Sequence, residues 1–170
     1  MPRAAWLLPL LLIAAPVRAA DAAPVNPQID YAGFGKLVRQ LEPVREAHRL
    51  PLDEFLHRAR ADGALLLAAR AESAFARGHI RGAINLPFSD FTDEALARVI
   101  GGRADRPIYI YCNNNFSDNR DPVVTKRVVL ALNIPTFVNL HGYGYANVWE
   151  LADVVSTAAL GEDWVPTPTS

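Results

Sequence analysis

Short apolar runs alternate with segments of helical spacing along most of the chain. The runs Ala64–Ala68 and Pro107–Tyr111 are continuously apolar or aromatic, as expected of strands buried inside a sheet. A further core strand is predicted over 147–151, and a short strand ends at Pro87. Capping signals and spacing predict helices over residues 33–44, 51–61, 72–77, 92–100 and 121–132. This alternation predicts an α/β sheet covered by helices on both faces.

The helix predicted over 121–132 rests on two residues at its start. Asp121 is a suitable N-cap, and Pro122 suits the first helical position. Pro135 is expected to break the pattern, with a second short helix continuing to Leu140. The end of the chain, with its repeated Pro and Thr, is expected to fray.

The first twenty residues have the three parts of a secretory signal peptide. Arg3 gives a positive start, an apolar stretch follows from Ala4 to Val17, and a small residue, Ala19, suits a cleavage site. Fourteen residues of helix span ~21 Å, which is short of the ~30 Å hydrocarbon core of a bilayer. We therefore expect an exported protein, periplasmic or secreted, with no stable membrane anchor after cleavage.

Composition narrows the classes of function. A chain of 170 residues with 51% hydrophobic and 21% charged residues is a single globular domain, and a net charge of −1 does not suit a non-specific nucleic-acid binder. The single cysteine excludes a disulfide scaffold and any site with several thiolate ligands. The histidines have no metal-ligand spacing, so we expect neither a metal nor a cofactor.

Cys112 is the residue best placed for chemistry. It follows a predicted strand directly and precedes a loop and a helix, and ligand sites of α/β sheets lie at this edge. A helix N-terminus favours a thiolate, the nucleophilic form of cysteine. Because consecutive asparagines tolerate positive φ, the loop is predicted to turn its amides toward one anion. The amides of that predicted cradle are those of Asn113, Asn114, Asn115, Phe116 and Ser117. From these residues alone, an equally good interpretation is that Cys112 is a small apolar residue at the end of a strand, with no chemical role.

Four segments, in order, resemble the single-domain rhodanese family. They are Arg70 with Glu72, the stretch Gly78–Asn85, the strand-Cys112-loop-helix arrangement and the stretch Tyr145–Leu151. The resemblance covers residues 50–155, preceded by a signal peptide at 1–20 and an extension with a helix at 21–49, and followed by a tail at 156–170.

The resemblance implies a mostly parallel five-stranded sheet and a sulfurtransferase activity. Cys112 would take sulfane sulfur from a small donor such as thiosulfate, hold it as a persulfide and pass it to cyanide or a thiol acceptor. Arg120 would close the loop, and Arg70 would attract the anionic donor.

Three departures separate the chain from the family pattern. Ala68 stands where an Asp is usual, Ala152-Asp153 stands where Gly-Gly is usual, and the predicted helix begins nine positions after Cys112. We expect the longer loop to draw the helix N-terminus away from the sulfur. Asp118, six positions after Cys112, excludes the Cys-x5-Arg pattern of phosphatases. Three hypotheses remain: a sulfurtransferase, a non-catalytic binding module, and a thiol-redox sensor or disulfide-linked dimer acting through Cys112.

Overall fold

The computed structural model describes residues 26–166. The signal-peptide prediction for residues 1–20 lies outside this range. Residues 26–30 form a turn in which the amide of Ile29 donates to the carbonyl of Asn26, and a separate compact unit begins at Tyr31. No helix within residues 26–166 combines the length and apolar character that crossing a membrane requires.

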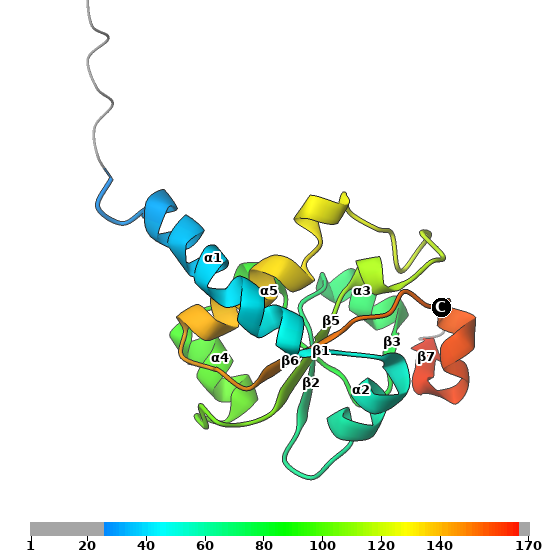
Figure 1. The fold of residues 1–170 in the computed structure, drawn as a ribbon. Coiled ribbons are helices and arrows are strands. Elements are labelled where there is room, and N and C mark those ends of the chain that lie inside the picture. Colours follow the sequence, from blue (N-terminus) through cyan, green and yellow to red (C-terminus); the bar gives the residue numbers. More distant parts are fainter. Residues whose placement is uncertain (1–25, 167–170) are drawn as a thin grey trace, which may run out of the picture. The chain divides into compact units, whose positions relative to one another are not determined.

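A five-stranded sheet forms the centre of this unit (Figure 1). Every neighbouring pair of its strands is parallel. In spatial order the strands are β1 (Arg49–Leu50), β6 (Val148–Leu151), β5 (Ile108–Tyr111), β2 (Leu65–Ala68) and β4 (Ile84–Asn85). The predicted α/β class and the mostly parallel five-stranded sheet are therefore confirmed. Two further strands, β3 (Gly78–Ile80) and β7 (Trp164–Pro166), pair antiparallel in a sheet of their own.

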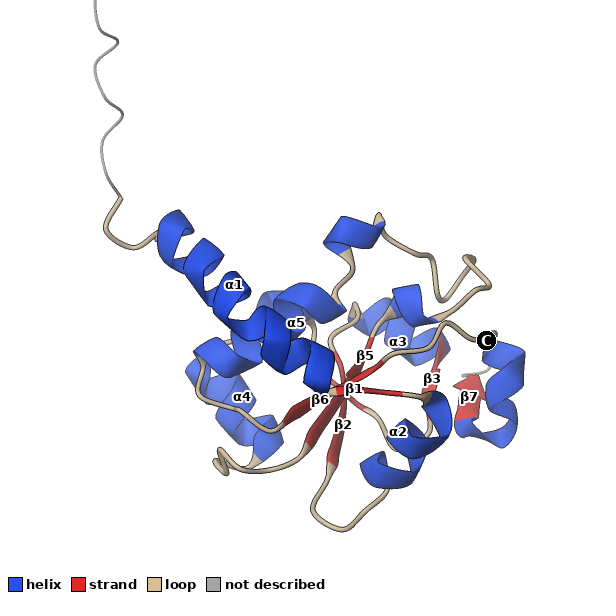
Figure 2. Ribbon diagram, viewed as in Figure 1, coloured by secondary structure: helices blue, strands red, loops and turns tan. Residues whose placement is uncertain are grey.

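Helices cover both faces of the central sheet (Figure 2). One face carries α1 (Tyr31–Ala47), α4 (Asp93–Ile100) and α5 (Asn133–Gly142), and the other carries α2 (Leu52–Ala59) and α3 (Glu72–Arg77). Side chains of β5 alternate between the two cores: Ile108 and Ile110 pack toward α4 and α5, and Tyr109 and Tyr111 toward α2. Because both faces are covered, β2 and β5, which are buried along their whole length, contain only apolar or aromatic residues.

The helix ends follow the expected capping chemistry. The hydroxyl oxygen of Thr92 accepts from the amide of Ala95 at 3.2 Å at the start of α4, and Gly101 ends that helix with a φ of 86°. Helix α3 has the predicted bounds, and α1 extends beyond the predicted 33–44 at both ends.

The helix predicted over 121–132 is wrong. This stretch is irregular except for η3 (Val128–Leu130), a single 3-10 turn. Asparagine side chains hold its backbone instead: Asn113 Nδ2 donates to Val124 O and Asn114 Nδ2 donates to Lys126 O, both at 2.8 Å. Such side-chain bonds compete with a helical ladder, and the β-branched run that follows Pro122 has little helical preference to oppose them.

Two further expectations about the second half of the chain fail. Pro135 does not break a helix, because α5 begins at Asn133 and Pro135 lies in its first turn, where an amide has no intrahelical acceptor. Much of the predicted tail over 156–170 is structured: η4 (Thr157–Asp163) consists of 3-10 turns interrupted at Gly161, and β7 pairs with β3. Residues 167–170 lie outside the described range.

Candidate functional site

Cys112 lies at the carboxyl end of β5, the middle strand of the central sheet. It directly precedes η2 (Asn113–Asn115), a 3-10 turn that begins the long connection to α5. Its side chain is buried, with 2% of the residue exposed. The strand therefore delivers the thiol to the sheet edge where α/β proteins bind ligands, below the surface of the loop.

Three backbone amides near the Cys112 sulfur favour its ionised form. They belong to Asn114, Asn133 and Leu132. Asn133 is the first residue of α5 and Leu132 is its N-cap, so the helix N-terminus faces the sulfur. The expectation of a helix N-terminus drawn away from the sulfur concerned the helix predicted from Asp121, which is absent; α5, which begins later in the chain, takes its place. The yellow part of the loop stands out from the rest of the domain in Figure 1, and the far end of the loop leads into α5, whose N-terminal amides act on the sulfur.

Burial nevertheless raises the pKa of the Cys112 thiol above its ordinary value of 9.0. The amides of Asn114, Asn133 and Leu132 act to lower the pKa, and the charge of Glu150 adds to the rise. The predicted thiolate is thus not the favoured form at neutral pH. Desolvation of the sulfur outweighs the helix N-terminus, because charge is costly away from water.

The predicted cradle over 113–117 is only partly present. The amides of Phe116 and Ser117 donate to the carbonyls of Asn113 and Val155 at 3.0 and 2.9 Å, so they are not available to an anion. The ring of Phe116 is a core side chain at 1% exposure, packed edge-on against Tyr111. Among the described non-glycine residues only Asn119 has a positive φ. The asparagines adopt a 3-10 turn instead of a left-handed nest.

Asn115 connects the loop to the sheet through its side chain. Its Oδ1 accepts from the amide of Cys112 and from Nδ2 of Asn133, both at 3.0 Å. Its Nδ2 donates to the carbonyls of Leu151 and Asp153 at 2.8 and 3.0 Å. A buried carboxamide with both atoms fully used fixes the position of Cys112 relative to β6 and α5.

Arg70 is a buried cation that contacts no carboxylate within residues 26–166. Only 1% of it is exposed, and its guanidinium donates to Asn113 Oδ1 at 2.6 Å and to the carbonyls of Gly78, Ala74 and Pro122 at 2.6, 3.0 and 2.7 Å. Burial lowers its pKa, whereas Tyr111 and Cys112 act to raise it. The usual Asp at position 68 is absent, and neutral oxygens hold the charge instead.

An open cavity of about 320 Å³ adjoins this cluster. Its wall includes Arg70, Asn113 and Leu132, which are neighbours of the sulfur, and the exposed Lys126. Cys112 itself is not among the residues that line the cavity. Arg120, the predicted closing residue, is exposed and does not line the cavity either. Lys126, Leu132 and Asn133 were not predicted, because only the folded loop brings them back to the site.

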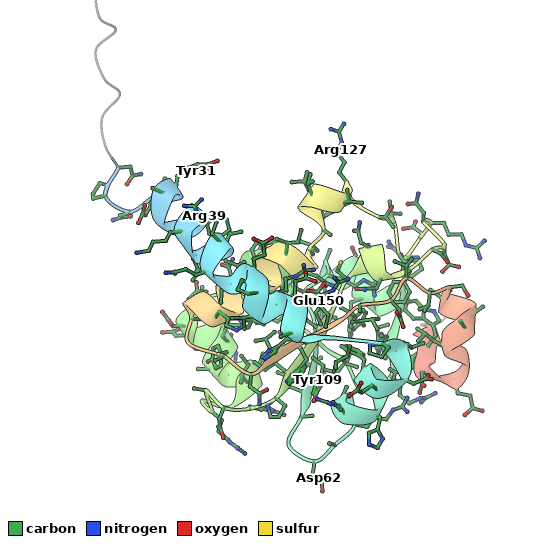
Figure 3. All side chains as sticks on the ribbon, viewed as in Figure 1. Tyr31, Arg39, Asp62, Tyr109, Arg127 and Glu150 are labelled. Atoms are coloured by element: carbon green, nitrogen blue, oxygen red, sulfur yellow. The ribbon has the colours of Figure 1, made fainter. Side chains whose placement is uncertain are left out.

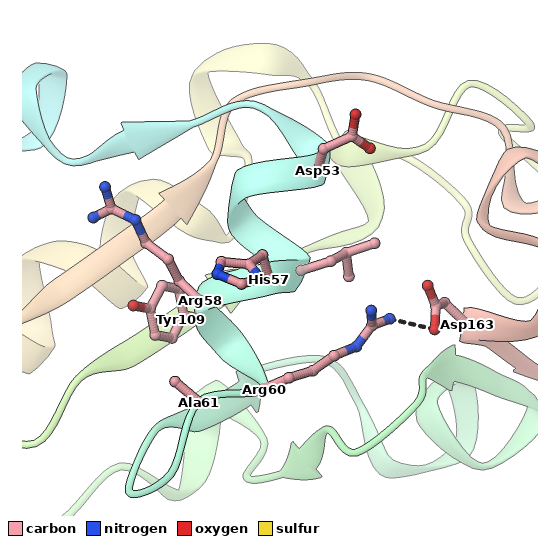
Figure 4. Close-up of a pocket in the computed structure, with 8 residues that line it drawn as sticks. Asp53, His57, Arg58, Arg60, Ala61, Tyr109 and Asp163 are labelled. Carbon is pink, nitrogen blue, oxygen red and sulfur yellow. Dashed lines mark ion pairs between the residues drawn. The ribbon is translucent and has the colours of Figure 1, made fainter.

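A larger cavity of about 590 Å³ lies along α2 (Figure 4). Its cations are already paired: Arg60 with Asp163, and Arg58 with Glu54. Arg58 also lies over the ring of Trp149, 5.0 Å from the centroid. These charges are neutralised within the protein, so this cavity offers no comparable attraction for an anion. Within the described range, no group of three or more acidic, histidine or cysteine side chains is arranged to hold a metal ion.

Comparison with known proteins gives the family. A family model of the rhodanese-like domain matches residues 52–153. The solution structure of the rhodanese-like domain of the Alr3790 protein from Anabaena sp. is 22% identical, with a TM-score of 0.47, and the match covers 72% of this chain and 86% of that one. The BH2092 protein from Bacillus halodurans is 14% identical, with a TM-score of 0.47 and coverage of 78% and 87%. No curated protein matches.

The matched stretch runs from the start of α2 through β6 to the loop that follows. It contains Cys112, the asparagine turn after it and the helix whose N-terminus faces the sulfur. Helix α1 and strand β1 precede it. The chain therefore belongs to the rhodanese-like domain family.

Proposed function

We propose that the protein is an exported sulfurtransferase of the rhodanese type, with Cys112 as nucleophile and sulfur carrier. The observation that carries the proposal is the convergence of the Asn114, Leu132 and Asn133 amides on one buried sulfur. Amides fixed at a helix N-terminus stabilise an anion without reorganising, and a persulfide is such an anion.

The proposed reaction has two steps. In the first, the Cys112 thiolate attacks the sulfane sulfur of thiosulfate, a new S–S bond forms, and the S–S bond of the donor breaks to release sulfite. The persulfide keeps one negative charge, and the bonding electron pair leaves with sulfite. In the second, cyanide or a thiolate attacks the outer sulfur and leaves as thiocyanate or as a new persulfide, which returns the Cys112 thiolate.

The cavity beside the site supplies the route for the donor. Arg70 and Lys126 give it two positive charges, and neither pairs with a carboxylate among residues 26–166. An anionic donor is attracted there and reaches the sulfur when the wall formed by Asn113 and Leu132 opens. Export remains part of the proposal on the strength of the signal-peptide pattern at 1–20.

A second function is favoured by one observation. Cys112 is 2% exposed, and burial raises its pKa, which suits a binding module that recognises an anionic partner without turnover. The same burial disfavours an intermolecular disulfide, because a second thiol would need direct access to the sulfur.

The experiment is intact-mass spectrometry of the chain lacking residues 1–20 after incubation with thiosulfate. The sulfurtransferase gains the mass of one sulfur atom, loses it to cyanide with formation of thiocyanate, and gains nothing as Cys112→Ala. No adduct with thiosulfate or with other sulfane donors supports the binding module. A species of twice the monomer mass on a non-reducing gel, absent in Cys112→Ala, supports the redox hypothesis.

A further inference from the structure

A buried carboxylate lies beneath the Cys112 site. Glu150 of β6 is 4% exposed and pairs in register with Ile110 of β5, two residues before Cys112. Its backbone amide donates to the carbonyl of His48 at 2.9 Å. Figure 3 shows Glu150 in the interior, beside the end of α1. A carboxylate in this position is costly unless a cation and hydrogen-bond donors compensate for its desolvation.

Arg45 supplies that cation from the last turn of α1. Its Nε donates to Oε2 of Glu150 at 2.6 Å, and its Nη2 donates to Oε1 at 2.5 Å. This two-bond pairing matches the planar guanidinium to both carboxylate oxygens. The side chain of Arg45 is 25% exposed, against 5% for that of Glu150. Helix α1 precedes the stretch matched by the family model, so this counter-charge comes from outside the matched domain.

A chain of buried hydrogen bonds joins the carboxylate to the cysteine. Asn133 Nδ2 donates both to Glu150 Oε1 at 3.1 Å and to Asn115 Oδ1 at 3.0 Å. That same Asn115 oxygen accepts from the amide of Cys112 at 3.0 Å. Asn133 also begins α5, whose N-terminal amides face the sulfur. The position of the Glu150 carboxylate therefore affects the sulfur in two ways, through charge and through the placement of Asn133.

Few other charged groups lie near this series of hydrogen bonds. The charge of Glu150 of β6 raises the pKa of the Cys112 thiol, and the sulfur interacts electrostatically with Arg70, which follows β2 and also interacts with Tyr111 of β5. Around Glu150 lie His48, which directly precedes β1, Arg49 of β1, and Glu46, which contacts Arg45 at 3.4 Å and pairs with Arg49 at 3.0 Å. Within residues 26–166, Arg45 is the only cation paired with the Glu150 carboxylate.

We propose that Arg45 is a positioning residue of the Cys112 site, which neutralises the buried Glu150 and keeps the α5 N-terminus aimed at the sulfur. Through Arg45, helix α1 takes part in setting the reactivity of the Cys112 thiol. The inference rests on the proposed function only in taking Cys112 as the reactive group.

The test is the pH dependence of iodoacetamide alkylation, which reports Cys112 alone because the chain has one cysteine. The rate is followed from about pH 7 to about pH 11 in the chain lacking residues 1–20. Arg45→Met is expected to move the midpoint upward by about one pH unit, so that alkylation near pH 8 is roughly tenfold slower. Glu150→Gln is expected to move it downward. Arg39→Met, a substitution at an exposed position on the same helix, is the matched control and leaves the profile unchanged.

The double variant separates this role from simple support of the fold. If Arg45 acts through the carboxylate, Arg45→Met combined with Glu150→Gln has the profile of Glu150→Gln alone, and Arg45→Lys lies between wild type and Arg45→Met. An unchanged profile in Arg45→Met overturns the proposal, as does a double variant that matches Arg45→Met. Should Arg45→Met not fold, the proposal requires Glu150→Gln to restore folding, and failure to do so overturns it. Alkylation needs no sulfur donor, so this result stands apart from persulfide formation.

Discussion

The contribution of the Asn115 side chain to the free energy of unfolding follows directly from its hydrogen bonds. We expect Asn115→Ala to destabilise the protein far more than the same change at Asn114, one residue earlier in the same turn. The Asn115 carboxamide makes four hydrogen bonds, three of them buried. Asn114 makes two, both exposed, to the backbone of Lys126.

The magnitude follows from what each truncation leaves behind. After Asn115→Ala, the amide of Cys112 and the carbonyl of Leu151 remain buried without their partners, and each costs about 1–3 kcal/mol. Asn133 keeps its bond to Glu150, and the carbonyl of Asp153 is partly accessible to water. The free energy of unfolding should therefore fall by about 4 kcal/mol. After Asn114→Ala, water replaces the lost bonds, and the fall stays below about 1 kcal/mol.

Equilibrium urea unfolding, followed by tryptophan fluorescence, measures both changes in the chain lacking residues 1–20. The two variants are compared with wild type at equal m-value, so that the midpoint reports stability. A loss below about 1.5 kcal/mol for Asn115→Ala would refute the assignment of a fully used buried carboxamide. So would equal losses for the two variants.

Three further outcomes follow from single contacts. Gly78→Ala should lower the free energy of unfolding by about 1–3 kcal/mol, because its Cβ would lie 2.5 Å from Trp164 Cζ2, and an unaltered urea midpoint would contradict this packing. Thr92→Ala should lower the free energy of unfolding by about 1 kcal/mol in the same assay, because it removes the N-cap of α4. An unchanged free energy would show that this cap does not stabilise the protein. The stability should also fall as the pH rises above the ordinary thiol value of 9.0, because the folded state holds the Cys112 proton more tightly than the unfolded state. Cys112→Ala should remove that part of the slope, and a variant with the wild-type slope would contradict the raised pKa.

Local pattern was sufficient for the elements that position the thiol. The run Ile108–Tyr111 followed by Cys112 predicted both the strand and the sheet edge where the sulfur lies. Thr92 and Gly101 marked the ends of α4, since capping depends on residues close in sequence. These contacts are short-range, so one stretch of sequence contains all the information they need.

The loop after Cys112 could not be predicted in this way. Asp121-Pro122 is a good helix start by local rules, yet the backbone at 124–126 is bonded to asparagine side chains ten or more residues earlier in the chain or to Asn119. The amides that reach the sulfur come from Leu132 and Asn133, at the far end of that loop. Long-range pairing of this kind leaves no periodic pattern in the sequence.

The groups that compensate the buried charges of the site could not be predicted from the sequence either. Arg70 looked like a residue that had lost its carboxylate at position 68, but neutral carbonyls and an amide oxygen from four segments hold it. Glu150 reads as an ordinary polar residue within a strand. Its importance comes from Arg45, more than one hundred residues earlier in the chain.

The most direct measurement of the central claim is the amide spectrum of ¹⁵N-labelled protein as thiosulfate is added. If three amides hold an anionic sulfur on Cys112, the resonances of Asn114, Leu132 and Asn133 move as the persulfide mass appears, and cyanide returns them. The resonances of Phe116 and Ser117, whose amides donate to backbone carbonyls, do not shift. A persulfide that forms while the three resonances remain unchanged, or thiosulfate that produces no persulfide, would contradict the account.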